Sequence, residues 1–349
     1  MTTVNFSSVT GALQKRFAPE VTSQIMRASP ILQILAGNIK MGDGQNIQWV
    51  PKFGTASAGS AAAIAEGADV ATFNTDTKEQ ASLLFGTYHE AFEISGKALA
   101  AAAAAGNPEQ LANLFESELM DAAQRLAHAI GGEIYSGTGA GERMTGLLGG
   151  AILDTGTYAG LSRITYPQWR GNVYGNGGVG RTVTIPMMRA VRTGVYKASG
   201  EKPGIIIGGP STVDQYGNTF GDQRRYVTDI KGAGGAVIKL DGGYTALEFD
   251  GTSVVEDAGC PEGKFLFLNL QHLFVKQLPQ PGMIASAQAT MRPLEAQAEQ
   301  LRGGGPTRFI IRIQPLAVNG DKFRFALYCY PQVQVRKPNA FGVLEDLNY

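Results

Sequence analysis

The chain of 349 residues is 44% hydrophobic, which is enough for a packed core and for two or three domains. Its 30 Lys and Arg residues balance 30 Asp and Glu residues, so the composition does not indicate a strongly basic protein that reads nucleic acid. The 46 glycines follow no short period, which excludes a collagen-like or low-complexity chain.

The first 40 residues are predicted to form an arm, because Pro19 and Pro30 interrupt its short helical patterns. Residues 46–53, and later 70–77 and 81–94, alternate apolar and polar side chains, as strands do, and a run of small residues at 54–68 joins the two parts. A ribbon of two strands cannot bury an apolar face alone. We therefore expect it to lie either on the domain that carries it or on a neighbouring subunit.

The longest helical signal covers residues 107–135. Asn107 can cap this helix, Pro108 suits its first position, and Gln110 completes a capping box. A helix of about 28 residues would be about 42 Å long. It is either one long helix across an ordinary domain or the spine of a flat, extended subunit. Its apolar stripe comprises Leu111, Phe115, Leu119, Ala122, Leu126 and Ile130.

The rest of the chain predicts a mixture of helices and strands. A helix over residues 186–199 ends before Gly200, a buried strand covers 204–209, and a second helix covers 210–220. One face of the first helix is expected to comprise Met187, Met188, Val191, Val195 and Tyr196. Five strands are expected at residues 237–240, 244–249, 253–256, 264–269 and 272–278, and a hairpin at 309–330. The fold class is therefore α+β.

One segment matches a phosphate-binding loop in part. Residues 175–182 read GNGGVGRT, with Arg181 where such loops carry Lys. Arginine is a broader, planar donor, no buried apolar strand precedes the segment, and Pro186 falls where the helix should continue. A surface loop is the favoured interpretation, and a nucleotide-binding enzyme is the alternative.

The sequence contains no recognisable catalytic or metal motif. His89, His128 and His272 are far apart, and Cys260 and Cys329 form no CxxC pair, so we expect structural histidines and reduced core thiols. Neither a nucleophile elbow nor a spaced carboxylate pair is evident. We therefore predict a protein that is not an enzyme and has no cofactor or metal, without a signal peptide or a membrane-spanning segment.

The order of these elements resembles the major capsid proteins of tailed bacteriophages with the HK97-type fold. The resemblance is carried by the arm, the ribbon, the spine helix, the stretch GLSRITYPQWR at residues 160–170 and the closing stretch at 323–344. It covers nearly the whole chain. It implies an HK97-like fold with an arm at 1–40, an extended loop at 41–96, a peripheral domain at 97–183, an axial domain at 184–276 and further peripheral strands at 277–349.

The resemblance also implies that the extended loop lies over a neighbouring subunit. The candidate contacts between subunits are Ile47, Trp49, Lys52, Phe53, Leu83 and Phe85, and a neighbour would cover the apolar ones. Some family members form a covalent cross-link from a Lys on this loop to an Asn on a neighbour. Lys52 would be that lysine here, but no motif identifies its partner.

The function implied is a structural protein that self-assembles as pentamers and hexamers into the icosahedral head of a virion, after a stage in the host cytoplasm. The expected partners are other copies of the chain, a scaffolding protein, a portal, a decoration protein and double-stranded DNA held without sequence specificity. The alternatives are an encapsulin-like compartment shell, a tail or baseplate protein, and the nucleotide-binding enzyme named above.

Overall fold

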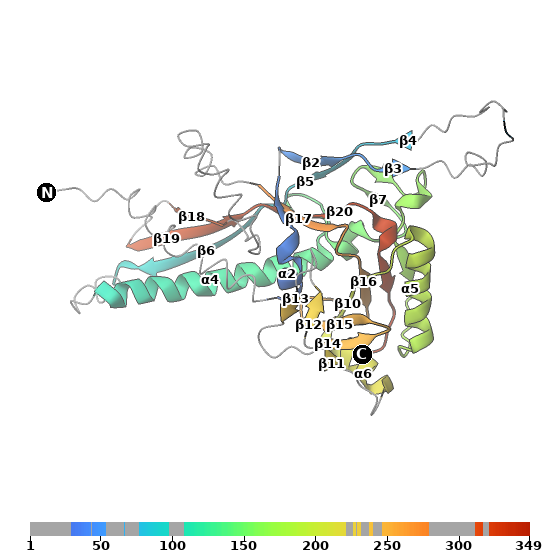
Figure 1. Ribbon diagram of the computed structural model, residues 1–349. Helices are drawn as coiled ribbons and strands as arrows, with labels where there is room; N and C mark the ends of the chain where they lie inside the picture. Colours follow the sequence, from blue (N-terminus) through green and yellow to red (C-terminus); the bar gives the residue numbers. More distant parts are fainter. Residues whose placement is uncertain are drawn as a thin grey trace.

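The computed structural model describes residues 29–42, 44–53, 66, 77–97, 108–220, 226–227, 229–231, 237–239, 246–278, 311–316 and 321–349. Only the backbone is described for residues 52–53, 77, 108–116, 220 and 315, and for those between 226 and 246. The subunit is elongated, with a long helix and a sheet projecting from a thicker body (Figure 1).

The long helix α4, Pro108–Ser136, confirms the predicted spine. Its 29 residues span about 43 Å at about 1.5 Å per residue. The described part of the apolar stripe, Leu119, Ala122, Leu126 and Ile130, is at most 2% exposed. The predicted cap Asn107 and the side chains of Leu111 and Phe115 lie outside the described residues.

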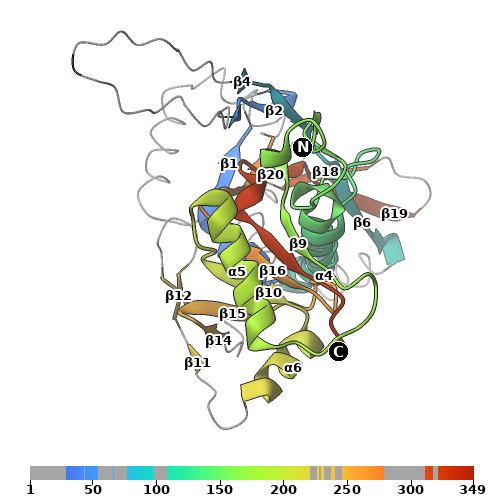
Figure 2. The ribbon, with the colours of Figure 1, turned by 90° about the vertical axis from the view of Figure 1, so that its right-hand side faces the viewer.

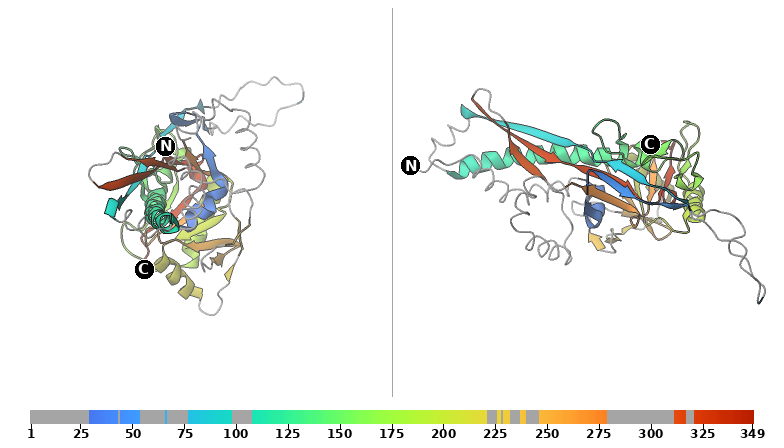
Figure 3. Two further views of the ribbon diagram at one scale, coloured as in Figure 1. Left: turned by 90° about the vertical axis from the view of Figure 1, so that its left-hand side faces the viewer. Right: turned by 90° about the horizontal axis from the view of Figure 1, so that it is seen from above.

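A three-stranded antiparallel sheet runs along α4 (Figure 3). Its order is β18 (Arg312–Pro315), β19 (Lys322–Cys329) and β6 (Tyr88–Ser95), so the predicted hairpin of β18 and β19 is confirmed. Phe92 and Ile94 of β6 are buried, and Phe92 stacks on Phe325 of β19. The strand expected over residues 81–94 is divided at residues 85–87, and its second half joins this sheet instead of the ribbon.

The body contains a seven-stranded sheet whose strands β10 (Ile205–Gly208), β16 (Phe265–Leu268) and β21 (Gly342–Leu344) are buried on both faces. Alternation along β10 directs Ile206 to a core beneath helices α5 and α6, and Ile205 and Ile207 to the main core. Figure 2 shows α5 lying across this sheet. The sheet order is β11 (Tyr226–Val227), β14 (Ala246–Phe249), β15 (Thr252–Glu256), β10, β16, β21 and β9 (Asn172–Tyr174).

Helices α5, Ile185–Ser199, and α6, Pro210–Phe220, confirm two predicted helices. Gly200 ends α5 in the left-handed region at φ 76°, as a terminal glycine should. The predicted apolar face is wrong at Tyr196, which is 50% exposed, because three residues of that face already fill the contact with the sheet. Those residues are Met188, Val191 and Val195.

A smaller sheet connects the body to the projection. It has the order β1 (Ile39–Met41), β17 (Leu273–Gln277) and β20 (Pro331–Val335), and helix α2 (Pro30–Leu35) is buried near it. A Cβ on Gly131 of α4 would come within 3.3 Å of Ser29, so glycine lets the chain before α2 approach the spine closely.

The remaining elements are short. They are the 3₁₀ turns Ala36–Asn38, Pro167–Trp169 and Pro338–Ala340, the π-helix Leu147–Ala151, and the antiparallel pair of β12 (Asp229–Lys231) with β13 (Val237–Lys239).

The predicted ribbon is present at the edge of the body (Figure 1). Strand β2 (Asn46–Trp49) pairs antiparallel with β5 (Ala81–Leu84), and β3 (Lys52–Phe53) pairs antiparallel with β4 (Thr77–Lys78). Beneath it lies a hairpin of β7 (Thr157–Tyr158) and β8 (Leu161–Ser162). Across the described residues, no helix is both long and apolar enough to cross a bilayer.

Candidate functional site

The inner face of the ribbon is buried against its own subunit. Ile47 and Leu83 are partners in the β2–β5 register and are 4% and 7% exposed, and Phe85 is 9% exposed. All three belong to the main hydrophobic core. The expectation that a neighbour is needed to cover these side chains is therefore wrong, because the same chain already covers them.

The outer face of the ribbon exposes two large apolar side chains among polar ones such as Gln48. Leu84 is 65% exposed and Val50, just after β2, is 57% exposed. Leu84 follows Leu83, so it points to the opposite face of the strand. The side chains of Lys52 and Phe53 lie outside the described residues, although their backbone forms β3. A role for the six predicted positions in subunit contacts stays a prediction.

An aromatic platform supports the ribbon from below. We use "platform" for Tyr158, Arg163 and Trp169. The ring of Trp49 lies 6.3 Å from the rings of both Tyr158 and Trp169, and those two rings stack 5.8 Å apart. The Trp169 indole N–H donates to the Tyr158 carbonyl, and the Tyr158 hydroxyl accepts from the Val335 N–H. Burial raises the pKa of Tyr158, so this hydroxyl stays neutral.

Two polar contacts also hold the ribbon on its own subunit. The Ser82 N–H donates to the Ala159 carbonyl at 3.0 Å, and the Tyr166 hydroxyl donates to Glu79 at 2.7 Å. Ala159 and Gly160 both have positive φ, 52° and 82°, as a two-residue hairpin turn between β7 and β8 requires. Gly160, the glycine of the sequence motif at 160–163, is thus the residue that lets this turn adopt a positive φ.

Arg163 holds the platform together from inside. Its side chain is 1% exposed, and its guanidinium donates to the carbonyls of Gly150, Ala151, Thr155 and Trp169. The first two carbonyls end the π-helix Leu147–Ala151, where the last carbonyls lack a partner within the helix. Among the described residues no carboxylate pairs directly with it. Burial lowers the pKa of Arg163 to about 10, so the group remains charged at neutral pH.

A buried carboxylate occupies the junction between α2, α4 and β15. We use "junction" for Asp257 and its partners. Asp257 is 1% exposed and accepts hydrogen bonds from the Ser29 hydroxyl, the Ile31 N–H and the Tyr135 hydroxyl at 2.9–3.0 Å. Its other oxygen accepts from the Gly259 N–H. Asp257 therefore caps the start of α2 from a distant part of the chain and ties it to the end of the spine.

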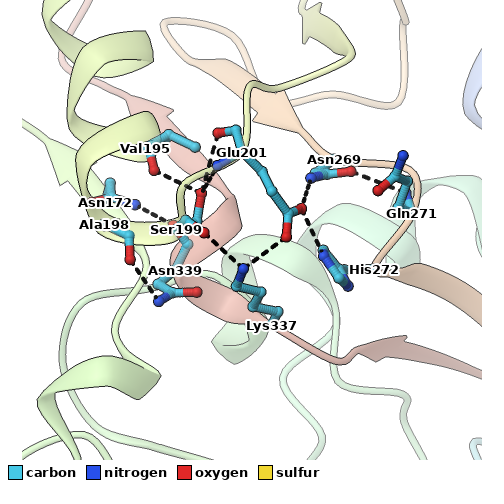
Figure 4. A network of polar contacts seen from close by, with 10 residues as sticks. All are labelled: Asn172, Val195, Ala198, Ser199, Glu201, Asn269, Gln271, His272, Lys337 and Asn339. Atoms are coloured by element: carbon cyan, nitrogen blue, oxygen red, sulfur yellow. Dashed lines mark hydrogen bonds and ion pairs between the residues drawn. The ribbon is translucent and has the colours of Figure 1, made fainter. Parts of the chain in front are cut away.

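A second carboxylate network joins α5 to the strand loops (Figure 4). Glu201 accepts from Asn269 at 2.6 Å, contacts the His272 ring at 2.8 Å and pairs with Lys337 at 2.7 Å. Lys337 also donates to the Ser199 carbonyl. Partial burial opposes the charge of Glu201, but the hydrogen bonds from Lys337 and His272 outweigh it and lower the pKa of this carboxyl.

The phosphate-loop candidate carries its own carboxylate. The N–H groups of Asn176 and Gly178 donate to one oxygen of Asp346 at 2.6 and 3.0 Å. These two hydrogen bonds lower the pKa of Asp346. The Arg181 guanidinium donates to the carbonyls of Tyr174 and Glu345. The N–H groups of Asn176 and Gly178 and one arm of the Arg181 guanidinium are therefore used inside the subunit, as expected of a surface loop.

The three histidines lie apart. His89 stacks on Tyr328, His128 is exposed on α4, and His272 contacts Glu201. Among the described residues, no group of three His, Cys, Asp or Glu side chains could hold a metal ion. Both cysteines are free and buried.

Sequence reasoning found the ribbon and the stretch at 160–170 but missed their connection. Nothing in the spacing of Trp49 relative to Tyr158 indicates that they meet, because the contact joins segments about a hundred residues apart. The junction at Asp257 and the network at Glu201 were missed for the same reason. A usable signal was present only for Arg163, whose place after Gly160-Leu161-Ser162 belongs to the resemblance motif.

Comparisons with known proteins agree on one family and one fold. A family model described as SU10 major capsid protein matches residues 2–294. The capsid asymmetric unit of cyanophage A-1(L) is similar at a TM-score of 0.65 and 20% identity, covering 92% of this chain and 93% of that one. No curated protein matches the sequence.

Two further solved structures share the fold. The SrpI encapsulin of Synechococcus elongatus PCC 7942 is similar at a TM-score of 0.52 and 10% identity, covering 91% of this chain and 88% of that chain. The capsid of the native GTA particle is similar at 0.51 and 12% identity, covering 93% and 91%. At these identities the likeness shows the HK97-like fold, which confirms the predicted fold class.

Proposed function

The chain belongs to the family of SU10 major capsid proteins, and from this premise we propose that it assembles as pentamers and hexamers into an icosahedral head around double-stranded DNA. Membership makes it a structural shell protein of a virion. A scaffolding protein, a portal and a decoration protein are its proposed partners, and assembly is proposed to take place in the host cytoplasm. Neither catalysis nor a cofactor is part of the proposed role.

The observation that carries this proposal is the two-sided ribbon. Its inner face is fixed to the platform through Trp49, so the ribbon is held at a defined angle to its own subunit. Its outer face still exposes Val50 and Leu84. Large apolar side chains left exposed on the same face of a ribbon suit a surface that another protein covers. In a closed shell that protein is a neighbouring copy, which makes the contact heterologous and ring-forming.

The test compares shell formation by the wild-type chain and by Val50→Ser with Leu84→Ser. We expect wild-type shells in electron micrographs, and at least tenfold fewer shells from the double variant with an unchanged unfolding temperature. Val179→Ser, which alters a 63% exposed side chain on the loop after β9, is the matched control and should assemble normally. Deleting residues 54–67 should also leave soluble protein that forms no shells.

Two results would refute the proposal. Wild-type yields from the Val50 and Leu84 variant would show that the outer face takes no part in assembly. Particles that enclose a cargo enzyme instead of DNA would assign the chain to the encapsulin-like alternative, which shares the fold.

A further inference from the structure

Three cations are gathered on one face of the small sheet formed by β1, β17 and β20. The Lys40 ammonium lies 4.3 Å from the centre of the Phe274 ring, and the Arg336 guanidinium, just after β20, lies 4.5 Å from it. Lys276 is the register partner of Lys40 in the β1–β17 pair. Because residues 274 and 276 are two apart on β17, their side chains point to the same face of the sheet.

The cations repel one another. Lys40 and Arg336 are exposed, and within the described part of the chain neither forms an ion pair. The Lys276 ammonium donates to the Met41 carbonyl at 3.4 Å. The pKa of Lys40 is lowered, first by partial burial and then by the positive charges of Arg336 and Lys276. An anion that contacts all three cations would relieve this repulsion.

A buried amide oxygen on the same face has no hydrogen-bond partner among the described residues. It is Oε1 of Gln334, a side chain that is 1% exposed. Gln334 is the register partner of Phe274 in the β17–β20 pair, and directly opposite residues of paired strands share a face. A half-turn of the amide replaces this oxygen by the NH₂ group, which donates to anions. Since an unpartnered buried amide is unfavourable, a ligand that bonds to it would be stabilising.

A groove opens beside the cations, at the root of the ribbon. It has a volume of about 400 Å³ and is lined by Lys276 and by residues 42 and 44–48. This volume is within the range of small-molecule sites. Asn46, one of the lining residues, also has an amide oxygen that is buried without a partner in the described part of the chain. Because Lys276 belongs to both the cation group and the groove, a ligand held by the cations has space to extend.

We propose that this face binds a compact anion carrying several phosphate groups, held by Lys40, Lys276 and Arg336. Lysine binds phosphate as a point charge, and arginine binds it through paired N–H donors. Three positive charges on one face match a ligand with several negative charges better than they match a single carboxylate.

The size of the ligand follows from the geometry of the cations. Lys40 and Arg336 both lie within 4.5 Å of the same ring centre, so neighbouring phosphate groups of one small molecule can reach both. Duplex DNA, in contrast, carries its charges along a track and is matched by cations spread along it. The inference concerns the single subunit and goes beyond the proposed function.

Calorimetric titration of the unassembled chain with inorganic triphosphate tests the site. We expect one ligand per subunit at about 0.05 M NaCl and weaker binding at higher salt, because salt screens exposed charges. Lys40→Gln with Arg336→Gln keeps long side chains beside Phe274 but removes both charges. It should raise the Kd for triphosphate at least tenfold at an unchanged unfolding temperature. Wild-type affinity in this variant would overturn the proposal.

Lys197→Gln with Lys202→Gln is the matched control. Both lysines are exposed, and Lys202 lies over the Tyr196 ring much as Lys40 lies over Phe274. The control removes the same number of positive charges, so its Kd should stay within about twofold of the wild-type value. A loss of affinity as large as that of the Lys40 and Arg336 variant would show general electrostatic attraction and overturn the site.

Gln334→Met distinguishes a formed site from a patch of surface charge. It keeps a long side chain but removes the amide, so we expect the Kd for triphosphate to rise at least threefold. The unfolding temperature should stay the same or rise, because an unpartnered buried amide is gone. Unchanged affinity would reduce the site to surface charge and overturn the proposal.

Three further ligands decide the chemical class. ATP should bind at least as tightly as triphosphate, because the groove beside Lys276 has room for its nucleoside, and weaker binding would exclude the groove from the site. Equal binding of citrate, a tricarboxylate, would overturn the assignment to phosphate groups. Tighter binding of a DNA duplex of about 20 base pairs would overturn the compact ligand and assign the cations to packaged DNA. The titrations need no shells, so their failure and a failure of shell assembly are told apart.

Discussion

The platform and the junction each hold a buried charge, and among the described residues neither charge has an oppositely charged partner in direct contact. Within that part of the chain, Arg163 donates to backbone carbonyls alone, whereas Asp257 accepts from N–H and hydroxyl groups alone. In both places neutral dipoles replace the counter-ion. A buried charge is tolerated in this way when its hydrogen-bonding capacity is nearly filled.

The two regions differ in where the partners come from. Every acceptor for Arg163 lies between residues 150 and 169, so this charge holds together one local surface, the platform on which the ribbon packs. The donors to Asp257 come from residues 29–31, from Tyr135 and from Gly259, so this charge fixes distant parts of the chain relative to one another. The platform should therefore govern assembly, and the junction should govern the cooperativity of unfolding.

Replacing the arginine of the platform should have the largest effect. Arg163→Leu leaves four carbonyls without their donor, three of them in buried hydrogen bonds, and we expect it to cost about 3–5 kcal/mol of unfolding free energy. The comparison predicts that shell formation is lost even at temperatures where the variant is still folded, because Trp49 loses its support. Urea unfolding followed by circular dichroism, together with electron microscopy, measures both.

Arg170→Leu is the control for this prediction. Arg170 is exposed and donates a single hydrogen bond, to the Arg163 carbonyl, so its loss should cost less than about 1 kcal/mol. Equal effects of the two substitutions would show that burial of the guanidinium does not matter, and the comparison would fail.

The carboxylate of the junction comes next. Asp257→Asn keeps the shape but removes the charge and turns one acceptor into a donor that faces other donors. We expect a loss of about 2–3 kcal/mol, with α2 separating from the end of α4 before the rest unfolds. Hydrogen exchange at the Ile31 N–H reports that local opening. Asp121→Asn, on the exposed side of α4, should change neither quantity.

How much of this could be predicted from the sequence depends on the range of the contacts. The spine helix and the buried strand β10 were predictable from local sequence, because Leu119 and Ala122 follow a helical period and residues 205–207 form a continuous apolar run. The ribbon was predictable as a pair of strands. The side chains that cover its inner face were not predictable, because Tyr158 and Trp169 are far from Trp49 in the sequence and meet it only in the folded chain.

The candidate site shows the same limit. The resemblance placed the extended loop at the ribbon and marked the stretch at 160–170, but it attached no physical role to Arg163. The four carbonyls that surround this guanidinium leave no mark on residue identity, since every residue has one. The burial of Ile47 and Leu83 within one subunit was mispredicted for a related reason. An apolar face needs a cover, but the pattern does not say which chain supplies it.

The network at Glu201 gives a contrasting case, because this carboxylate has a true counter-charge, Lys337, but lies closer to solvent. Its side chain is 32% exposed, and Lys337 and His272 lower its pKa below the ordinary value of 4.5 despite partial burial.

A carboxyl whose pKa falls on folding contributes stability above about pH 4.5, and that contribution is lost as the pH drops through the folded-state pKa. Glu201→Gln should therefore cost less than about 1 kcal/mol at neutral pH, and the difference from wild type should shrink as the pH falls below about 4.5. Urea midpoints of the unassembled protein at about pH 7 and about pH 3.5 measure this difference. A loss as large as that of Asp257→Asn, or one that persists in acid, would mean that counter-ions hold this fold together more strongly than buried dipoles do.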